Sequence, residues 1–230
     1  SSCSSLGSDS RSGIMTLEPY RRGALLHSDD FRHGIGQWRL EAQVPSRVVA
    51  ENGILDIDSP EGFTAWFVPK LSGPVLIEYE AQAVSEGGAN DQVSDLNAFW
   101  MANDPKRPGD LLAQPRSGAF ADYDTLQTYY VGQGGNRNTT TRFRRYIGAA
   151  GNRPILPEHD LAGPADMLVP NQWQTVRLVA FGNLIQYWRD ERKIFELNDP
   201  EPYVQGWFGV RTTKNHLRVR NLRVHQLSPR

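Results

Sequence analysis

One short stretch combines most of the groups that could do chemistry. Residues 129–146 read YYVGQGGNRNTTTRFRRY, with two adjacent tyrosines, a Gly/Asn turn, three consecutive threonines and arginines on both sides of them. Strands on either side of a turn project alternate side chains onto one surface. Phenol, hydroxyl and guanidinium groups gathered there suit an anionic sugar better than a hydrophobic core. The stretch therefore predicts a carbohydrate-directed β-protein.

Alternation along the predicted strand 139–147 separates its side chains into two sets. One face carries Thr140, Arg142, Arg144 and Tyr146, and the other carries Thr141, Phe143 and Arg145. Phe143 is the natural core residue, so Arg142 and Arg144 are expected to face outward, where guanidinium groups bind carboxylates through paired hydrogen bonds. The alternative is a solvated strand face whose arginines pair with neighbouring acids.

The adjacent tyrosines must point to opposite faces if their segment is a strand. One of them is expected to pack in the core and the other to meet a ligand. Gln127 shares a face with Tyr129, which favours Tyr129 over Tyr130 as the acid/base group. The alternative for either phenol is a side chain that merely spans core and surface.

The segment Asp95–Ala102 also sorts by alternation. Its apolar set, expected to face the core, is Leu96, Ala98, Trp100 and Ala102. Its other set is Asp95, Asn97, Phe99 and Met101. Asn97 is then expected in the cleft, where its amide could share a carboxylate with an arginine; the alternative is an Asn that caps a bulge or turn.

Two histidines are candidates for proton transfer. His159 lies between Glu158 and Asp160 in an irregular region, and flanking carboxylates favour the imidazolium form. A surface histidine with no chemical role is the alternative. His216, close to Lys214 and just before the last predicted strand, is the second candidate. The other three, His27, His33 and His225, are interpreted as structural.

The elements expected to position these groups are short strands separated by Gly, Pro and Asn. The predicted strands are 46–56, 63–68, 75–84, 95–102, 125–131, 139–147, 174–181, 184–189, 193–196, 206–212 and 217–226. No helical period lasts three turns, which favours a β-sandwich. Two proline-containing regions, 103–123 and 148–171, are predicted to be long irregular loops flanking the Tyr/Arg stretch.

Bulk composition limits the possible partners. The 25 basic and 26 acidic residues give a net charge of −1, so no global field attracts nucleic acid or a membrane surface. Cys3 is the single cysteine and cannot form an internal disulfide. Its Ser-rich setting resembles the end of a bacterial lipoprotein signal, although a flexible tail with an incidental thiol explains it equally. No run of eighteen apolar residues is present.

Both ends of the chain resemble concanavalin A-like jelly-roll domains of bacterial secreted sugar-degrading enzymes. The opening segment 26–41 has an Asp-Phe pair, a glycine spacer and then Trp38, and the segment 207–224 is similar to the closing strands. Residues 94–101, the Thr/Arg run and 158–161 are similar to a subgroup assigned as polysaccharide lyases. The resemblance implies an all-β concanavalin A-like β-sandwich (jelly roll), with long loops over one face. We expect a tether over residues 1–20 and one catalytic domain over 21–230.

This resemblance implies cleavage of an acidic, uronate-containing polysaccharide by β-elimination. Such a lyase neutralises the C5 carboxylate, removes the C5 proton and protonates the leaving oxygen. The candidate catalytic residues are Asn97, Tyr129, Arg142 and His159. The candidate substrate-binding residues are Asp95, Gln127, Tyr130, Arg144, Arg145, Lys214 and His216. We expect a monomer exported to the periplasm or cell surface, with membrane attachment only through a lipid on Cys3.

Two other functions stay open, because one fold supports many chemistries. Glu78 and Glu80 share a strand face roughly 6.5 to 7 Å apart by strand rise, which keeps a glycoside hydrolase, including the three-keto-disaccharide type, as an alternative. A noncatalytic carbohydrate-binding module is the other. Neither a Gly-x-Ser-x-Gly motif nor a His-x-x-x-His or Cys cluster is present. No cofactor is required, and Asp29 or Asp30 are possible ligands of a structural calcium.

Overall fold

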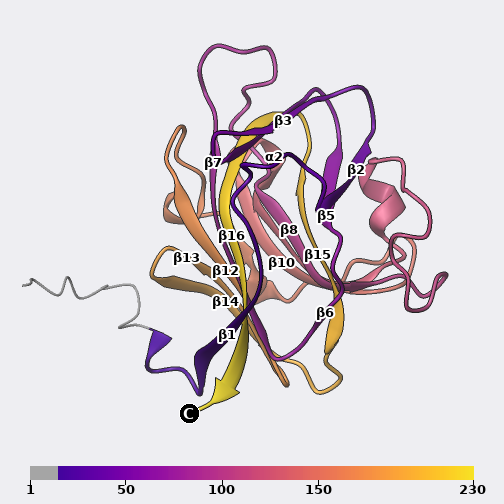
Figure 1. Ribbon diagram of the computed structural model, residues 1–230, viewed down its shortest axis with the longest axis vertical. Coiled ribbons are helices and arrows are strands. Elements are labelled where there is room, and N and C mark those ends of the chain that lie inside the picture. Colours follow the sequence, from indigo (N-terminus) through magenta and orange to yellow (C-terminus); the bar gives the residue numbers. More distant parts are fainter. Residues whose placement is uncertain (1–14) are drawn as a thin grey trace, which may run out of the picture.

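The computed structural model describes residues 15–230, which form two antiparallel β-sheets packed face to face (Figure 1). Sheet A has the order β14-β13-β12-β7-β16-β4-β3, with β1 also paired to β16. Its strands are β1 (Tyr20–Asp29), β3 (Arg47–Glu51), β4 (Ile54–Ser59), β7 (Val75–Ala83), β12 (Gln174–Phe181), β13 (Leu184–Arg189), β14 (Arg192–Asn198) and β16 (Asn215–Pro229).

Sheet B has the order β11-β10-β9-β8-β15-β5-β2, with the short β6 also paired to β15. Its strands are β2 (Trp38–Ala42), β5 (Phe63–Phe67), β6 (Leu71–Ser72), β8 (Asn97–Asn103), β9 (Gln127–Gly134), β10 (Thr140–Ile147), β11 (Asp160–Leu161) and β15 (Gln205–Thr212). The helical elements are single turns: η1 (Phe120–Tyr123), α2 (Gly135–Asn138), η2 (Pro157–His159) and η3 (Pro164–Asp166). The all-β sandwich with long loops over one face is confirmed.

The core lies between the two sheets and follows the period of two in the sequence. On β7, Val75, Ile77 and Tyr79 are buried in the core, while Glu78 and Glu80 lie on the outer face. Aromatic rings from both sheets meet there. Ring centroids lie 5.8 Å apart for Trp100 and Phe143, and 5.9 Å apart for Phe143 and Phe195. Burial of this apolar surface is the main stabilising term of the sandwich.

Most predicted strands occur within a few residues of their expected bounds, and β12 and β13 have the expected bounds. The predicted strand 46–56 is instead a hairpin of β3 and β4. Asn52 and Gly53 both have positive φ, 54° and 83°, which is the backbone that a tight hairpin turn requires. The first strand begins at Tyr20, and Tyr20 is buried against sheet A. Cys3 and the rest of the proposed lipid-anchor motif lie outside the described residues.

The loop between β8 and β9 covers part of the outer face of sheet B (Figure 1, pink, right). Leu111, Tyr123 and Leu126 pack there against Trp66 and Phe99. A buried carboxylate fastens the loop. Glu41 accepts hydrogen bonds from Trp66 Nε1 at 2.9 Å, Tyr123 Oη at 2.8 Å and Arg116 N at 2.9 Å. Among residues 15–230, no helix has the length and apolar character needed to cross a membrane.

Candidate functional site

A set of polar side chains lies on the outer face of sheet B, beside the β8–β9 loop. We call this set the arginine face and define it as Asn97, Tyr130, Arg142, Arg144, Arg153 and Arg211. Strand register brings them together: Arg144 is paired with Tyr130 across β10 and β9, and Arg211 with Asn97 across β15 and β8. Alternation explains the shared face, since Phe143, Val131 and Val210 point into the core on the same strands.

Arg144 is a partly buried cation with unusual surroundings. Its guanidinium donates a hydrogen bond to the backbone carbonyl of Arg153, and it makes no ion pair with any carboxylate of residues 15–230. Burial lowers the pKa of Arg144, and the positive charges of Arg153 and Arg142 lower it further. The folded protein therefore holds this charge at an energetic cost that an anionic ligand would relieve.

Tyr130 lies at the centre of the face, 5% exposed. Its ring centroid is 4.8 Å from that of Phe99, 5.5 Å from Tyr146 and 5.9 Å from Phe120. Burial raises the pKa of its phenol well above the ordinary value, and the cations Arg211 and Arg153 act in the opposite direction. No described residue of the chain accepts or donates a hydrogen bond at its hydroxyl. The phenol is therefore protonated near neutral pH.

Arg211 adds a buried positive charge beneath the loop, at 1% exposure. Its Nη1 donates to Thr64 Oγ1 at 3.0 Å and to Gly118 O at 2.9 Å, and its guanidinium lies 4.7 Å from the ring centre of Tyr123. Within the described chain its Nε and Nη2 are buried without hydrogen-bond partners, and so is Asn97 Oδ1. Unpaired buried polar groups are costly and mark places where a ligand can contribute hydrogen bonds.

Arg142 agrees with the alternative expectation, a strand face whose arginines pair with neighbouring acids. Its Nε lies 2.8 Å from Asp160 Oδ1, and the two residues are register partners on β10 and β11. Arg153 lies 3.5 Å from Asp124 Oδ1 and 4.4 Å from the ring centre of Phe120. The arginine face thus contains two compensated cations at its rim, and Arg144 and Arg211 as uncompensated ones.

Tyr129 does not lie on this face, which corrects our expectation that it is the phenol turned toward the cleft. It is fully buried in the core, where Oη donates to Asp199 Oδ2 at 2.7 Å and accepts from Tyr203 N at 2.9 Å. Arg145 shares this carboxylate, with Nε 2.7 Å from Asp199 Oδ2. The inner side of β9 and β10 therefore uses Tyr129 and Arg145 in a structural network, and Gln127 belongs to the same side as Tyr129.

His159 is also displaced from its expected surroundings. The ring is buried, with centroids 5.1 Å from Phe143 and 5.6 Å from Phe195, and Nε2 lies 3.1 Å from Glu196 O. Its neighbour Asp160 is paired with Arg142 instead of with the imidazole. The expectation that carboxylates surround the imidazole is therefore wrong, because the turn η2 packs the ring against the aromatic side chains of the core. A role of His159 in proton transfer stays a prediction.

Other predicted residues are dispersed. Met101 turns into the core because a bulge gives it a positive φ of 52°, although alternation from Asn97 had placed it outward. Asp95 accepts hydrogen bonds from Ser94, Asn97 and Thr213 beside the face. Lys214 lies in the turn between β15 and β16. His216 is on sheet A, 2.8 Å from Asp56 Oδ1, away from the arginine face.

The role of Asp29 or Asp30 as a ligand of a structural calcium stays a prediction, and in this structure both carboxylates serve the turn after β1. The two oxygens of Asp29 accept hydrogen bonds from Phe31 N at 2.8 Å and Trp38 Nε1 at 2.8 Å, and Asp30 accepts one from Arg32 N. Calcium requires several converging oxygen ligands. Among residues 15–230, no group of three or more His, Cys, Asp or Glu could hold a metal ion.

Three residues at the site were not predicted from the sequence: Phe120, Arg153 and Arg211. A signal for Arg211 was present, because this arginine directly follows the apolar run Trp207–Val210 in a predicted strand. Phe120 and Arg153 come from the two long loops and had no such signal. Only the folded loops bring them onto sheet B.

The two sheets and the loop-covered outer face define a jelly-roll β-sandwich of the galectin and concanavalin type. The chain is similar to a protein of unknown function with galectin-like fold from Bacillus subtilis, with 16% identity and a TM-score of 0.71, over 92% of this chain and 100% of that one. It is also similar to an endo-β-1,3-glucanase from Pyrococcus furiosus, with 11% identity and a TM-score of 0.62, over 92% of this chain and 99% of that one. For the carbohydrate-binding module CBM66 from Bacillus subtilis the identity is 11% and the TM-score 0.55, over 84% of this chain and 97% of that one.

Residues 57–222 match the family described as "Domain of unknown function (DUF6250)", and the chain belongs to this family. No curated protein matches the chain. At these identities the solved structures show the fold alone. They include glycoside hydrolases and carbohydrate-binding proteins, which agrees with the expected carbohydrate association, while the expected resemblance to lyases is not shown.

Proposed function

We propose that the arginine face binds a saccharide that carries a carboxylate group. The observation that carries this proposal is Arg144, a partly buried guanidinium between two other arginines with no carboxylate partner among the described residues. A ligand carboxylate would pair with Arg144 through two parallel hydrogen bonds and offset the repulsion from Arg142 and Arg153. Acidic polysaccharides lie outside cells, so the proposal includes an exported protein.

The neighbouring groups fit the rest of a sugar ring. The Tyr130 hydroxyl, which has no partner among the described residues, would form a hydrogen bond with a sugar hydroxyl. Phe120 contributes an apolar ring at the edge of the loop, and flat rings of this kind stack on sugar faces. The arginine charges would select the acid and the aromatic groups would orient it, so binding is the function with the fullest support.

Cleavage by β-elimination is a second candidate, favoured by the partner-free hydroxyl of Tyr130. In this reaction a phenolate at Tyr130 would take the C5 proton, the C5–H electrons would form the C4–C5 double bond, and the C4–O bond would break. The same phenol would then protonate the leaving oxygen. Arg144 would stabilise the charge that develops on the carboxylate. Burial disfavours the phenolate and Arg211 and Arg153 favour it, so the rate should rise with pH.

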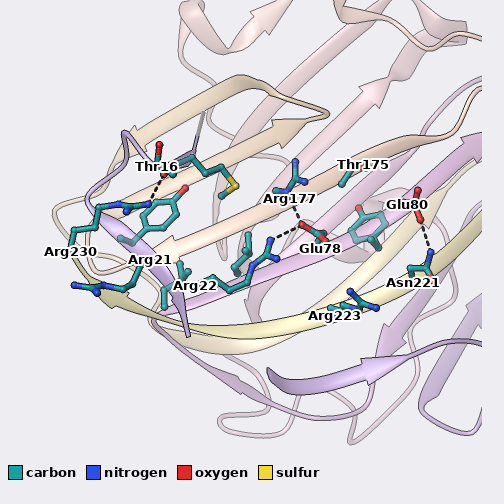
Figure 2. A pocket seen from close by; sticks show the side chains of 15 residues that line it. Thr16, Arg21, Arg22, Glu78, Glu80, Thr175, Arg177, Asn221, Arg223 and Arg230 are labelled. Atoms are coloured by element: carbon teal, nitrogen blue, oxygen red, sulfur yellow. Dashed lines mark hydrogen bonds and ion pairs between the residues drawn. The ribbon is translucent and has the colours of Figure 1, made fainter. Parts of the chain in front are cut away.

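Hydrolysis through Glu78 and Glu80 has weaker geometric support. Both carboxylates lie on the outer face of sheet A (Figure 2), on a different sheet from the arginine face. Glu78 Oε2 is 2.7 Å from Arg177 Nε and 3.1 Å from Arg22 Nη2, and Glu80 pairs with Arg220. A glycosidase needs one protonated carboxylic acid. Here both carboxylates are engaged in ion pairs with arginines.

Calorimetry with a uronate oligosaccharide and its carboxyl-reduced neutral analogue tests the proposal. Wild-type protein is expected to bind the acid and not the neutral analogue, and Arg144→Gln is expected to weaken binding about tenfold or more, the loss of one charge-assisted pair. Arg39→Gln is the matched control, since Arg39 is an exposed arginine on β2 of the same sheet. Equal affinity for both ligands, or an Arg144→Gln protein that binds like the control, would overturn it.

The same samples separate binding from cleavage. Ultraviolet absorbance of an unsaturated uronate product would establish elimination, and Tyr130→Phe should then abolish it while leaving affinity within about threefold. New reducing ends without absorbance would establish hydrolysis and contradict the elimination candidate. Binding without any product would identify a carbohydrate-binding protein.

A further inference from the structure

A long groove crosses the outer face of sheet A. It consists of two hollows, of about 470 Å³ and about 590 Å³, that both include Asn221 and Arg223 of β16 in their walls. The first hollow is lined by β1, β7, β12 and β16 (Figure 2), and the second by β1, β16 and the loop that follows β1. The two hollows therefore adjoin at Asn221 and Arg223.

The first hollow carries an excess of positive charge. Arginines 21, 22, 177, 223 and 230 line it, against the carboxylates of Glu78 and Glu80. Arg22 and Arg177 both hydrogen bond to Glu78, as Figure 2 shows. Arg21 Nε donates only to the backbone carbonyl of Pro229, and Arg223 makes no hydrogen bond or ion pair within residues 15–230. These two exposed cations have no acid of their own.

The second hollow contributes polar groups of a different kind. It is lined by Gln37, His33 and His225 and also by Asp29 and Asp30, whose carboxylates can accept hydrogen bonds from sugar hydroxyls. His225 Nδ1 is buried and has no hydrogen-bond partner in the described part of the chain. Burial lowers the pKa of His225, as do the positive charges of Arg22 and Arg223, so the imidazole is neutral near pH 7. A neutral imidazole both accepts and donates hydrogen bonds, which suits sugar hydroxyls.

We propose that this groove binds a strand of an anionic polysaccharide, as a second carbohydrate surface separate from the arginine face. Repeated acidic groups along the strand would pair with Arg21 and Arg223, and hydroxyls would meet the polar groups of the second hollow. Two hollows in succession fit several consecutive sugar units better than one sugar. The inference rests on the charges of sheet A and does not require the function proposed for sheet B.

Binding to immobilised polygalacturonate tests this inference, with dextran as the neutral polymer. The test variant is Arg21→Glu with Arg223→Glu. The matched control is Arg39→Glu with Arg137→Glu, which changes the net charge equally at two exposed arginines outside the groove. Each pair is also made in the Arg144→Gln background, so that the arginine face cannot mask the groove. Circular dichroism and thermal melts confirm that every variant is folded.

We expect the groove variant to bind polygalacturonate about tenfold or more weakly than the control, in both backgrounds. The difference should shrink as salt is raised, since ions screen exposed charges. Equal affinity of groove variant and control, or equal binding of dextran and polygalacturonate by the wild type, would overturn the inference. Failure of the arginine-face proposal would appear separately, as an Arg144→Gln protein indistinguishable from wild type on the oligosaccharide.

Discussion

Tyr130 and Arg144 are register partners on β9 and β10, and both side chains lie on the outer face of sheet B. Their chain neighbours Tyr129 and Arg145 are register partners as well, and both point to the inner side, where they share Asp199. One hairpin thus supplies the same pair of residue types to two faces. The inner pair is bound to a buried carboxylate, and the outer pair has no carboxylate partner among residues 15–230.

Replacement of Arg144 should separate stability from binding. Burial and the charges of Arg153 and Arg142 depress the pKa of Arg144, so the folded state disfavours its cation. Arg144→Met removes that charge but retains an apolar stem. The free energy of unfolding is expected to stay equal or rise by up to about 1 kcal/mol, while affinity for the uronate falls. Urea unfolding measures the first quantity; a loss above about 2 kcal/mol would show that Arg144 is structural.

Asp199 should make stability depend on acid pH. Burial alone would raise the pKa of this carboxyl, but hydrogen bonds from Tyr129, Arg145 and Glu201 N outweigh it and lower the pKa. A depressed carboxyl pKa stabilises the fold above the unfolded value of 3.8, and the contribution is lost as the pH falls through the folded pKa. Asp199→Asn should cost about 2 to 3 kcal/mol at pH 7.

Thermal melts of wild type and Asp199→Asn across the acid range check this. The difference between them should be largest at neutral pH. It should begin to shrink below about pH 4, where the carboxyl of the unfolded chain takes up a proton, and disappear below the lower pKa of the folded state. A difference that stays constant with pH would mean that the carboxylate charge is not what stabilises this network.

Glu41 is predicted to hold the β8–β9 loop on sheet B. Glu41→Ala removes the acceptor for Trp66, Tyr123 and Arg116, which leaves buried donors unpaired. We expect a loss of about 3 kcal/mol in the free energy of unfolding and faster hydrogen exchange across 104–126. Glu61→Ala, at an exposed position, is the control. Unchanged exchange in this loop would contradict the role of Glu41.

Gly209 is predicted to be required for the position of Trp66. A Cβ at residue 209 would lie 2.6 Å from Trp66 Cε3, so the fully buried indole would have to move. Gly209→Ala should lower the free energy of unfolding by about 1 to 3 kcal/mol and change the near-ultraviolet circular dichroism. Gly36→Ala is the control, because a Cβ there meets no atom within 4 Å. Equal melting temperatures of the Gly209→Ala and Gly36→Ala proteins would show that the Trp66 side chain accommodates the added methyl group without loss of stability.

Much of the fold was predictable from local pattern. Alternating polarity in 139–147 correctly placed Phe143 in the core and Arg144 on the outside, because strand geometry has a period of two. The turn at Asn52 and Gly53 was missed, although an Asn-Gly pair between two apolar runs is itself a hairpin signal. The irregular regions 103–123 and 148–171 were also expected, and they contain only single helical turns and the short β11.

The sequence by itself determined that tyrosines and arginines alternate along one hairpin, and therefore that each pair of neighbours divides between two faces. Only the tertiary structure decided that Tyr130, and not Tyr129, shares the outer face with Arg144, because this depends on the register between β9 and β10. Asp199, on the chain segment after β14, draws Tyr129 and Arg145 inward, and the loops that carry Phe120 and Arg153 cover the other side. Contacts between residues so distant in sequence leave no periodic signal in the chain.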